Sequence, residues 1–164
     1  MIEFMLIAGP RSGTTWAANW LTTDTTHCLH DPLYQYHYEE LDGIESLKSL
    51  GVSCTGLMNF PKFVNAHPAR KVILRRPQRE VDESLHLLGL PSVDCSPLDQ
   101  IEGTHYHWKA LFDDPKMIYE SLTGRRFNAE RHEFLKTIHV QPQFQQISIN
   151  RAVTTRLLNE LRGL

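Results

Sequence analysis

Short continuous apolar runs alternate along this chain with apolar residues at helical spacing. Residues 4–8 and 71–74 have the length and character of strands buried on both faces. Residues 16–21 follow the first run after a loop of Gly, Pro, Ser and Thr, and they predict the start of a helix. Residues 81–88 follow the second run with apolar side chains at i, i+4 and i+7, which is typical of an amphipathic helix. This alternation predicts an α/β fold, a three-layer P-loop-type parallel sheet flanked by helices.

Weaker signals predict the remaining elements. Strands are predicted at residues 27–30, 52–60 and 117–119, and helices at residues 44–50, 61–67, 96–111, 128–138 and 150–161. The polar residues 33–42 have no clear period, and they predict either an acceptor-binding loop or lid, or a half-exposed edge strand. The Gln-rich residues 141–146 predict a linker.

Composition and charge narrow the function classes. The 164 residues fit a single domain, 1–164, and the formal charge of −2 is spread rather than clustered. A nucleic-acid groove or an anionic membrane surface is therefore not expected. The three cysteines have no C-x-x-C spacing, which argues against a disulfide framework or a zinc site. Because no apolar run is long enough to span a bilayer, the sequence predicts a soluble, cytoplasmic protein.

The loop after the first strand has the chemistry of an anion site, because backbone N–H groups converge there and the next helix begins with a partial positive charge. In nucleoside-triphosphate loops, G-x-x-x-x-G-K-[ST], the Lys contacts the phosphates and the hydroxyl holds Mg²⁺. Here Ala8 and Gly13 occupy the two glycine positions. Thr14 stands where the Lys would be, and Thr15 keeps the hydroxyl. Arg11 supplies the positive charge of the loop, so the sequence predicts phosphate binding of a different kind.

The segment P-R-S-G-T-T-W at residues 10–16 resembles the 5′-phosphosulfate loop of the sulfotransferases that use 3′-phosphoadenosine 5′-phosphosulfate (PAPS). The resemblance implies transfer of a sulfuryl group, without a metal, from PAPS to the hydroxyl of a small molecule, a sugar or a tyrosyl side chain. Adenosine 3′,5′-bisphosphate is the implied product. The residues implied to bind the cofactor are Arg11, Ser12, Gly13, Thr14, Thr15 and Trp16. Arg11 would also stabilise charge on the departing phosphate, and Trp16 would contact the adenine.

A second strand–turn–helix unit resembles the family's 3′-phosphate element. Arg76 follows the predicted strand, and Ser84 comes eight residues later, the spacing of that element. Arginine can hold a phosphate with paired N–H donors, and the Ser hydroxyl adds a third donor. Arg75 lies nine residues before Ser84, so the choice between the two arginines stays open. Tyr119, in a Tyr-Glu-x-Leu segment similar to one of the family, is implied to lie near the adenine.

A candidate general base follows the second predicted strand. Asp31 precedes Pro32, which disfavours the helical region and predicts an extended Asp31 at the carboxyl end of the strand. Ligands of open α/β sheets lie beyond these ends, so Asp31 should face the loop. The tyrosylprotein branch of the family has a carboxylate base at the same spacing, and a turn-forming Asp is the structural alternative. Other candidates for the base are His30, Lys62 and His67.

Two further functions remain open. A P-loop small-molecule kinase is disfavoured because the loop Lys is absent and the strand at 71–74 is followed by arginines instead of the Mg²⁺-binding Asp. A non-catalytic adenine-nucleotide-binding module is kept open because the chain is shorter than most family members. The sequence also has no counterpart of the family's late Arg-Lys-Gly segment.

Overall fold

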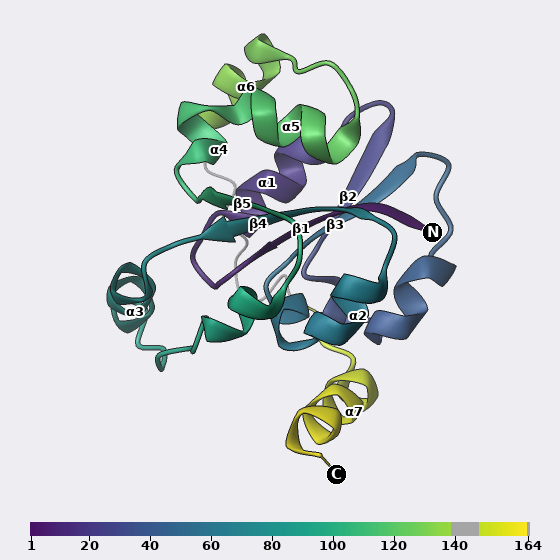
Figure 1. Cartoon of the computed structure of the whole chain (residues 1–164), viewed down its shortest axis with the longest axis vertical. Helices are drawn as coiled ribbons and strands as arrows, with labels where there is room; N and C mark the ends of the chain where they lie inside the picture. The colour runs from purple at the N-terminus through teal and green to yellow at the C-terminus, as the bar shows by residue number, and fades with distance from the viewer. Residues whose placement is uncertain (139–147, 164) are drawn as a thin grey trace.

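One parallel sheet forms the centre of the computed structural model, which describes residues 1–138 and 148–163. In this part of the chain the sheet has five strands in the order β2-β3-β1-β4-β5 (Figure 1). The strands are β1 (Ile2–Ala8), β2 (Thr26–His30), β3 (Ser49–Cys54), β4 (Arg70–Arg75) and β5 (Thr104–His107). All four pairings are parallel, so every strand ends at the same edge of the sheet. We call this edge the carboxyl edge, and the opposite one the amino edge.

Helices cover both faces of the sheet and complete three layers (Figure 1). One face carries α1 (Thr14–Leu21), α4 (Ala110–Asp113), α5 (Pro115–Thr123) and α6 (Ala129–Lys136). The other face carries α2 (Pro61–Ala66), α7 (Arg151–Arg162) and the 3₁₀ turns η1 (Pro32–Tyr34), η2 (Tyr38–Gly43), η3 (Gly56–Asn59) and η4 (Ser96–Gln100). Helix α3 (Gln78–His86) lies beyond the end of β4. The predicted three-layer α/β fold is confirmed.

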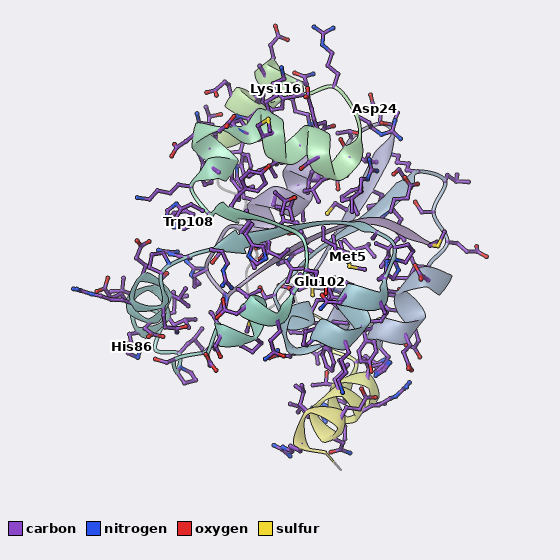
Figure 2. All side chains as sticks on the ribbon, in the orientation of Figure 1. Met5, Asp24, His86, Glu102, Trp108 and Lys116 are labelled. Carbon is purple, nitrogen blue, oxygen red and sulfur yellow. The ribbon has the colours of Figure 1, made fainter. Side chains whose placement is uncertain are left out.

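The central strand β1 packs on both faces of the sheet, which explains its continuous apolar sequence. Phe4 and Leu6 join the cluster around α1 and α5, whereas Met5 and Ile7 join the cluster around α2 and η3. All four side chains have no exposed surface. Met5 can be followed below the sheet in Figure 2. Burying each such side chain contributes about 1.5–3 kcal/mol, which fixes the strand from which the candidate site projects.

Several predicted elements match the structure, and three do not. The strands predicted at 4–8, 27–30 and 71–74 are confirmed, as are the helices that follow the first and last of them. The helix predicted at 44–50 is wrong, because the chain there bends into β3. The helix predicted at 96–111 is wrong, because only η4 is helical before the chain forms edge strand β5. The strand predicted at 117–119 is wrong, because it lies inside α5.

Smaller corrections concern the polar and C-terminal segments. Residues 33–42 form the turns η1 and η2 instead of an edge strand. Helix α6 is present, but Phe134 is 63% exposed, and its expected place in the core is taken by Leu135 alone. The linker predicted at 141–146 lies outside the described residues. Within the described ranges, the helices lack the length and apolar character of a membrane span.

Candidate functional site

The loop after β1 has a geometry that requires glycine at one position. Gly13 precedes α1 with φ of 89° and ψ of 15°, a left-handed conformation that favours glycine. A Cβ atom at this position would lie 2.9 Å from Leu111 Cδ1 of α4, so there is also no room for a side chain. The N–H groups of the first turn of α1 have no acceptor within the helix. The loop therefore presents backbone donors at the positive end of a helix.

Two residues of the predicted site have strained backbones. Arg11 has φ of 61° and Asp31 has φ of 42°, and among the described residues they are the only non-glycine residues with positive φ. Such a conformation costs on the order of 1–3 kcal/mol in a non-glycine residue, and it is found most often at functional sites. The extended conformation predicted for Asp31 is wrong. Local hydrogen bonding stabilises the left-handed one, because Asp31 Oδ1 accepts the Thr55 N–H at 2.7 Å.

Arg11 and Ser84 bring the two predicted phosphate elements into contact. Arg11 Nε donates to Ser84 Oγ at 3.2 Å, although 73 positions separate them in the sequence. Arg76 also reaches the loop, because its Nη1 donates to the backbone carbonyl of Arg11. The structure thus assembles one cluster of cations and hydroxyls from β1, β4 and α3.

Arg76, and not Arg75, points at the loop. The Arg76 guanidinium stacks over Trp108 at 4.5 Å from the ring centroid, and its Nε donates to Glu80 Oε2 at 3.3 Å. Trp108 Nε1 donates to the same oxygen at 3.3 Å, so the three side chains hold one another. Arg75 is turned away and pairs with Asp99 of η4. Sequence reasoning missed Trp108, which it assigned to a core-facing helix. Its position just after β5 at the carboxyl edge would have indicated a site residue.

A hollow of about 560 Å³ lies beside this cluster, at the ends of β4 and β5. Arg75, Arg76, Cys95 and His107 are among the residues that line it, and Figure 2 shows Trp108 at this end of the sheet. Its volume falls within the range of about 300–1,000 Å³ that is usual for small-molecule sites. Burial raises the pKa of the Cys95 thiol, and the nearby Asp94 and Asp82 charges raise it further, against the opposing charge of Arg75. Cys95 is therefore a neutral thiol at pH 7.

His30 connects the other side of the loop to Asp31. His30 Nε2 lies 3.1 Å from Thr15 Oγ1, 3.4 Å from Thr14 Oγ1 and 3.1 Å from Asp31 Oδ2. The His30 and Asp31 side chains are 28% and 16% exposed, so both remain accessible. Ser53 Oγ donates to the Thr14 carbonyl at 2.8 Å and ties the start of α1 to β3. The carboxylate of Asp31 is thus held by Thr55 and His30 within reach of solvent.

Trp16 lies in the core and not at the loop opening. Only 7% of its surface is exposed, and its Nε1 donates to the Leu135 carbonyl at 3.2 Å. The ring packs against Trp20 and Phe112, with centroids 5.4 and 4.9 Å away. The implied contact with adenine is not supported by this placement, because the second turn of α1 faces the cluster around α5 and α6 instead of the loop.

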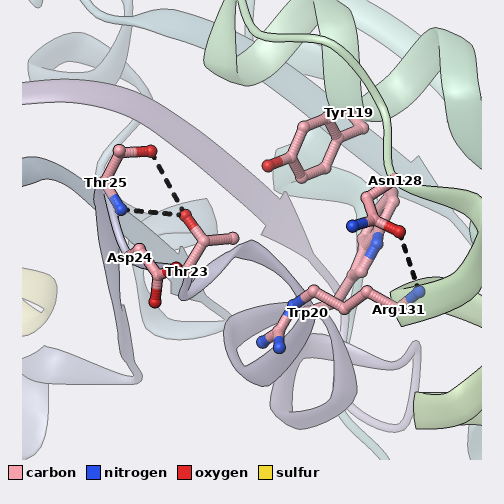
Figure 3. A pocket seen from close by; sticks show the side chains of 7 residues that line it. All are labelled: Trp20, Thr23, Asp24, Thr25, Tyr119, Asn128 and Arg131. Atoms are coloured by element: carbon pink, nitrogen blue, oxygen red, sulfur yellow. Dashed lines mark hydrogen bonds between the residues drawn. The ribbon is translucent and has the colours of Figure 1, made fainter.

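Tyr119 lies at the wrong edge of the sheet for the implied adenine contact. It lines a separate hollow of about 280 Å³ with Thr23, Asp24 and Arg131, shown in Figure 3. Residues 23–25 come just before β2, so this hollow is at the amino edge, as the position of Asp24 in Figure 2 also shows. Arg131 Nη2 donates to the carbonyls of Asn19 and Thr22 at 3.0 and 2.5 Å. Arg131 therefore closes the C-terminal end of α1, a structural role.

His67 and Lys62 also lie away from the loop cluster. His67 precedes β4 at the amino edge and is 6% exposed. Its Nδ1 accepts the Ala69 N–H at 3.0 Å, so Nε2 carries the proton and donates to Asp42 Oδ2 at 3.0 Å. Asp42 also accepts the Ile2 N–H at 2.7 Å. Lys62 is exposed in the first turn of α2, on the face opposite α1.

Asp42 has a lowered pKa for identifiable reasons. Partial burial acts to raise the pKa of Asp42, but hydrogen bonds from the Ile2 N–H and from His67 lower it by more. The His67 charge and the N-terminal ammonium lower it further. This pair therefore stabilises the starts of β1 and β4.

The described residues contain no group of three or more His, Cys, Asp or Glu side chains placed to hold a metal ion. Comparison of the chain with protein-family models, curated proteins and solved structures gives no match.

Proposed function

We propose that this protein is a sulfotransferase that moves a sulfuryl group from PAPS to an acceptor hydroxyl. The observation that carries the proposal is the meeting of Arg11 with Ser84 and Arg76. These residues belong to two segments that each resemble a PAPS-binding element. Their contact across the fold is what one ligand with two phosphate groups requires.

The donor groups at the carboxyl edge fit PAPS in kind and number. The backbone of the loop, with Ser12, Gly13, Thr14 and Thr15, would hold the 5′-phosphosulfate. Arg76 and Ser84 would hold the 3′-phosphate, and the hollow of about 560 Å³ beside them has room for the nucleoside. When bound, PAPS supplies a sulfuryl group activated by its link to phosphate.

Arg11 would stabilise the negative charge that develops during transfer. Its guanidinium is held by Ser84 before any ligand arrives, so little reorganisation is needed at the moment of reaction. Preorganised donors of this kind contribute more than the same groups in water. The strained backbone of Arg11 supports a functional role, since the loop keeps a residue that its conformation disfavours.

Asp31 would accept the proton of the acceptor hydroxyl. Its carboxylate lies at the carboxyl edge, and His30 links it to the hydroxyls of Thr14 and Thr15. General-base catalysis typically contributes about 10²–10⁴-fold to the rate. His30 is the alternative base, because its Nε2 lies as close to Thr15 as to Asp31.

The proposal is tested by thermal unfolding with adenosine 3′,5′-bisphosphate, AMP, and ATP with Mg²⁺. A ligand that binds only the folded state raises the melting temperature. We expect a large shift with adenosine 3′,5′-bisphosphate and a much smaller one with AMP, which lacks the 3′-phosphate. Arg76→Ala should remove most of the difference. Arg79→Ala is the matched control, since Arg79 is on the same helix with its side chain 89% exposed.

Equal shifts with AMP and the bisphosphate would remove the case for Arg76 and Ser84. A strict requirement for Mg-ATP would instead support the kinase. Binding of the bisphosphate without transfer to any acceptor would support the non-catalytic module.

Cys95 offers an independent probe of the same hollow. Its sulfur packs against the loop, since a Cβ atom on Gly9 would lie 2.6 Å from Cys95 Sγ. Bound nucleotide should therefore slow maleimide labelling of Cys95. Cys28 and Cys54 are internal controls, because both thiols are buried and burial raises their pKa values. Labelling of Cys95 at the same rate with and without saturating nucleotide would contradict the proposed location.

A further inference from the structure

A second cavity opens on the β2–β3 side of the loop, beneath α7. Its volume is about 250 Å³, and Asp31, Tyr34 and Thr55 line it together with residues of α7. It shares no lining residue with the hollow beside Arg76. The carboxyl edge therefore has two separate hollows, one on each side of the loop.

Asp31 joins this cavity to the loop. Its Oδ1 is fixed by the Thr55 N–H at 2.7 Å, and its Oδ2 lies 3.1 Å from His30 Nε2. The same His30 nitrogen lies 3.1 Å from Thr15 Oγ1. A hydroxyl bound at the polar end of the cavity would thus be separated from the loop hydroxyls by His30 and Asp31 alone.

The rest of the cavity wall is largely apolar. Phe60 and the α7 residues Leu157, Leu158 and Leu161 line it, and Asp31 is the one charged residue among the described residues that do. A sugar would place several hydroxyls against this wall without hydrogen-bond partners, which costs free energy. Leu158 and Leu161 are still 44% and 49% exposed, so an apolar ligand would remove further apolar surface from water. The wall therefore favours an apolar ligand with few polar groups.

Helix α7 is held from outside the cavity, so the cavity is present without a ligand. The Glu160 carboxylate lies 2.8 Å from His37 Nε2 and 2.9 Å from the Tyr38 hydroxyl. Arg156 Nη2 lies 2.6 Å from Glu39 Oε2. None of these residues lines the cavity. A preformed wall of this kind is usual in small-molecule sites.

We propose that this cavity binds the acceptor, and that the acceptor is a compact, uncharged alcohol or phenol with an apolar body. The assignment of the ligand as acceptor rests on the proposed function, but its binding can be measured separately. The ligand hydroxyl donates to the Asp31 carboxylate, and the apolar body packs against Phe60 and the α7 leucines. The volume of about 250 Å³ is below the range of about 300–1,000 Å³ of sites for drug-sized ligands, so a small ring system fits best.

The test is a calorimetric titration of the full chain with 2-naphthol and with 2-methoxynaphthalene, which lacks the O–H donor. We expect 2-naphthol to bind about tenfold more tightly or better, the effect of one hydrogen bond to a charged acceptor. Leu158→Gln and Leu161→Gln should each weaken both ligands by about threefold to tenfold, because they place an amide in the apolar wall. Leu47→Gln should leave both affinities unchanged, since Leu47 is fully exposed outside the cavity.

Three results would overturn the inference: equal affinity for the two naphthalenes, affinity unaffected by both α7 variants, or preference for glucose or an acidic tyrosine peptide. A parallel titration with adenosine 3′,5′-bisphosphate separates this inference from the proposed function. If the nucleotide binds and 2-naphthol does not, the acceptor assignment fails and the proposed function stands. If 2-naphthol binds in the cavity and the nucleotide does not, the proposed function fails and the binding site stands.

Discussion

Two histidine–aspartate pairs at opposite edges of the sheet have similar geometry and different surroundings. His30 and Asp31 lie 3.1 Å apart at the carboxyl edge, and His67 and Asp42 lie 3.0 Å apart at the amino edge. Both ring nitrogens of His67 are used by neighbouring groups, and its side chain is 4% exposed. His30 instead shares one nitrogen among a carboxylate and two threonine hydroxyls, and its side chain is 28% exposed.

The backbone separates the pairs further. Asp31 has a left-handed conformation, whereas Asp42 lies in a regular 3₁₀ turn, where it accepts the first strand N–H. The pair with saturated hydrogen bonds and a relaxed backbone stabilises the fold. The pair with accessible atoms and a strained backbone is the one suited to bind and react. Contact distance alone does not distinguish them.

Asp31→Asn should produce the largest effect. Asparagine keeps the acceptor oxygen and tolerates the left-handed backbone, so folding and bisphosphate affinity should be unchanged. Transfer from PAPS to 2-naphthol should fall by roughly two to four orders of magnitude because the base is lost. Asp42→Asn, the matched change at the amino edge, should leave the rate unaltered. A normal rate in Asp31→Asn, together with a loss in His30→Ala, would assign the base to His30.

Arg11→Ala should come next. It keeps the backbone donors of the loop but removes the guanidinium, and kcat should fall by roughly 10²–10³-fold with a smaller change in nucleotide affinity. Arg70→Ala is the control, since Arg70 is exposed at the start of β4 at the amino edge. Steady-state kinetics and nucleotide titration would measure both quantities. Equal losses in rate and affinity would limit Arg11 to binding.

His67→Ala should change stability without changing function. Loss of its two hydrogen bonds leaves buried partners unsatisfied, which costs about 1–3 kcal/mol, or a few degrees in melting temperature. The transfer rate per folded molecule should be unchanged, as measured below the melting transition. His30→Ala should show the reverse pattern. A rate loss in His67→Ala at full nucleotide affinity would contradict the division between the two edges.

The smallest effect should be a pH dependence at the amino edge. The pKa of Asp42 is lower in the folded state than its ordinary value near 4, so Asp42 stabilises the fold above that value. This contribution should decrease as pH falls below about 4 and through the lower folded pKa. Chemical unfolding of wild type and Asp42→Asn from pH 6 to pH 2 would measure it. Parallel stability curves over this range would show that Asp42 does not contribute.

The central part of the fold could be predicted because its signals are local. The apolar run of β1, the glycine at position 13 and the apolar start of α1 are contiguous, and each indicates the same strand–loop–helix unit. The loop donors, Arg76 and Ser84 follow from two such units at one edge. Prediction of these residues therefore needed no knowledge of long-range packing.

The errors arise where tertiary contacts override local pattern. Gly51 was expected to end a helix, but it is in β3 because the Phe4 ring leaves no room there, with Phe4 Cε2 only 2.0 Å from where a Cβ atom would stand. The spacing of apolar residues after Ser96 suggested a helix, but pairing of Tyr106 with Leu74 of β4 makes this segment an edge strand.

One error was avoidable. Helix α5 begins at Pro115 and is followed by a left-handed Gly124, the usual signals of a helix start and end. The short apolar run inside it was given more weight than these signals. Tyr119 was consequently placed on a strand, and its position at the amino edge was missed.

The positive φ angles of Arg11 and Asp31 also determine how the protein can change under selection. Glycine or asparagine at position 11 would fit the loop backbone better than arginine does. A library screened only for heat resistance should therefore lose Arg11, whereas a library screened for transfer should keep it. Position 31 should be less divided, because aspartate tolerates its conformation. The loop is thus a place where adaptation to heat and retention of activity favour different residues.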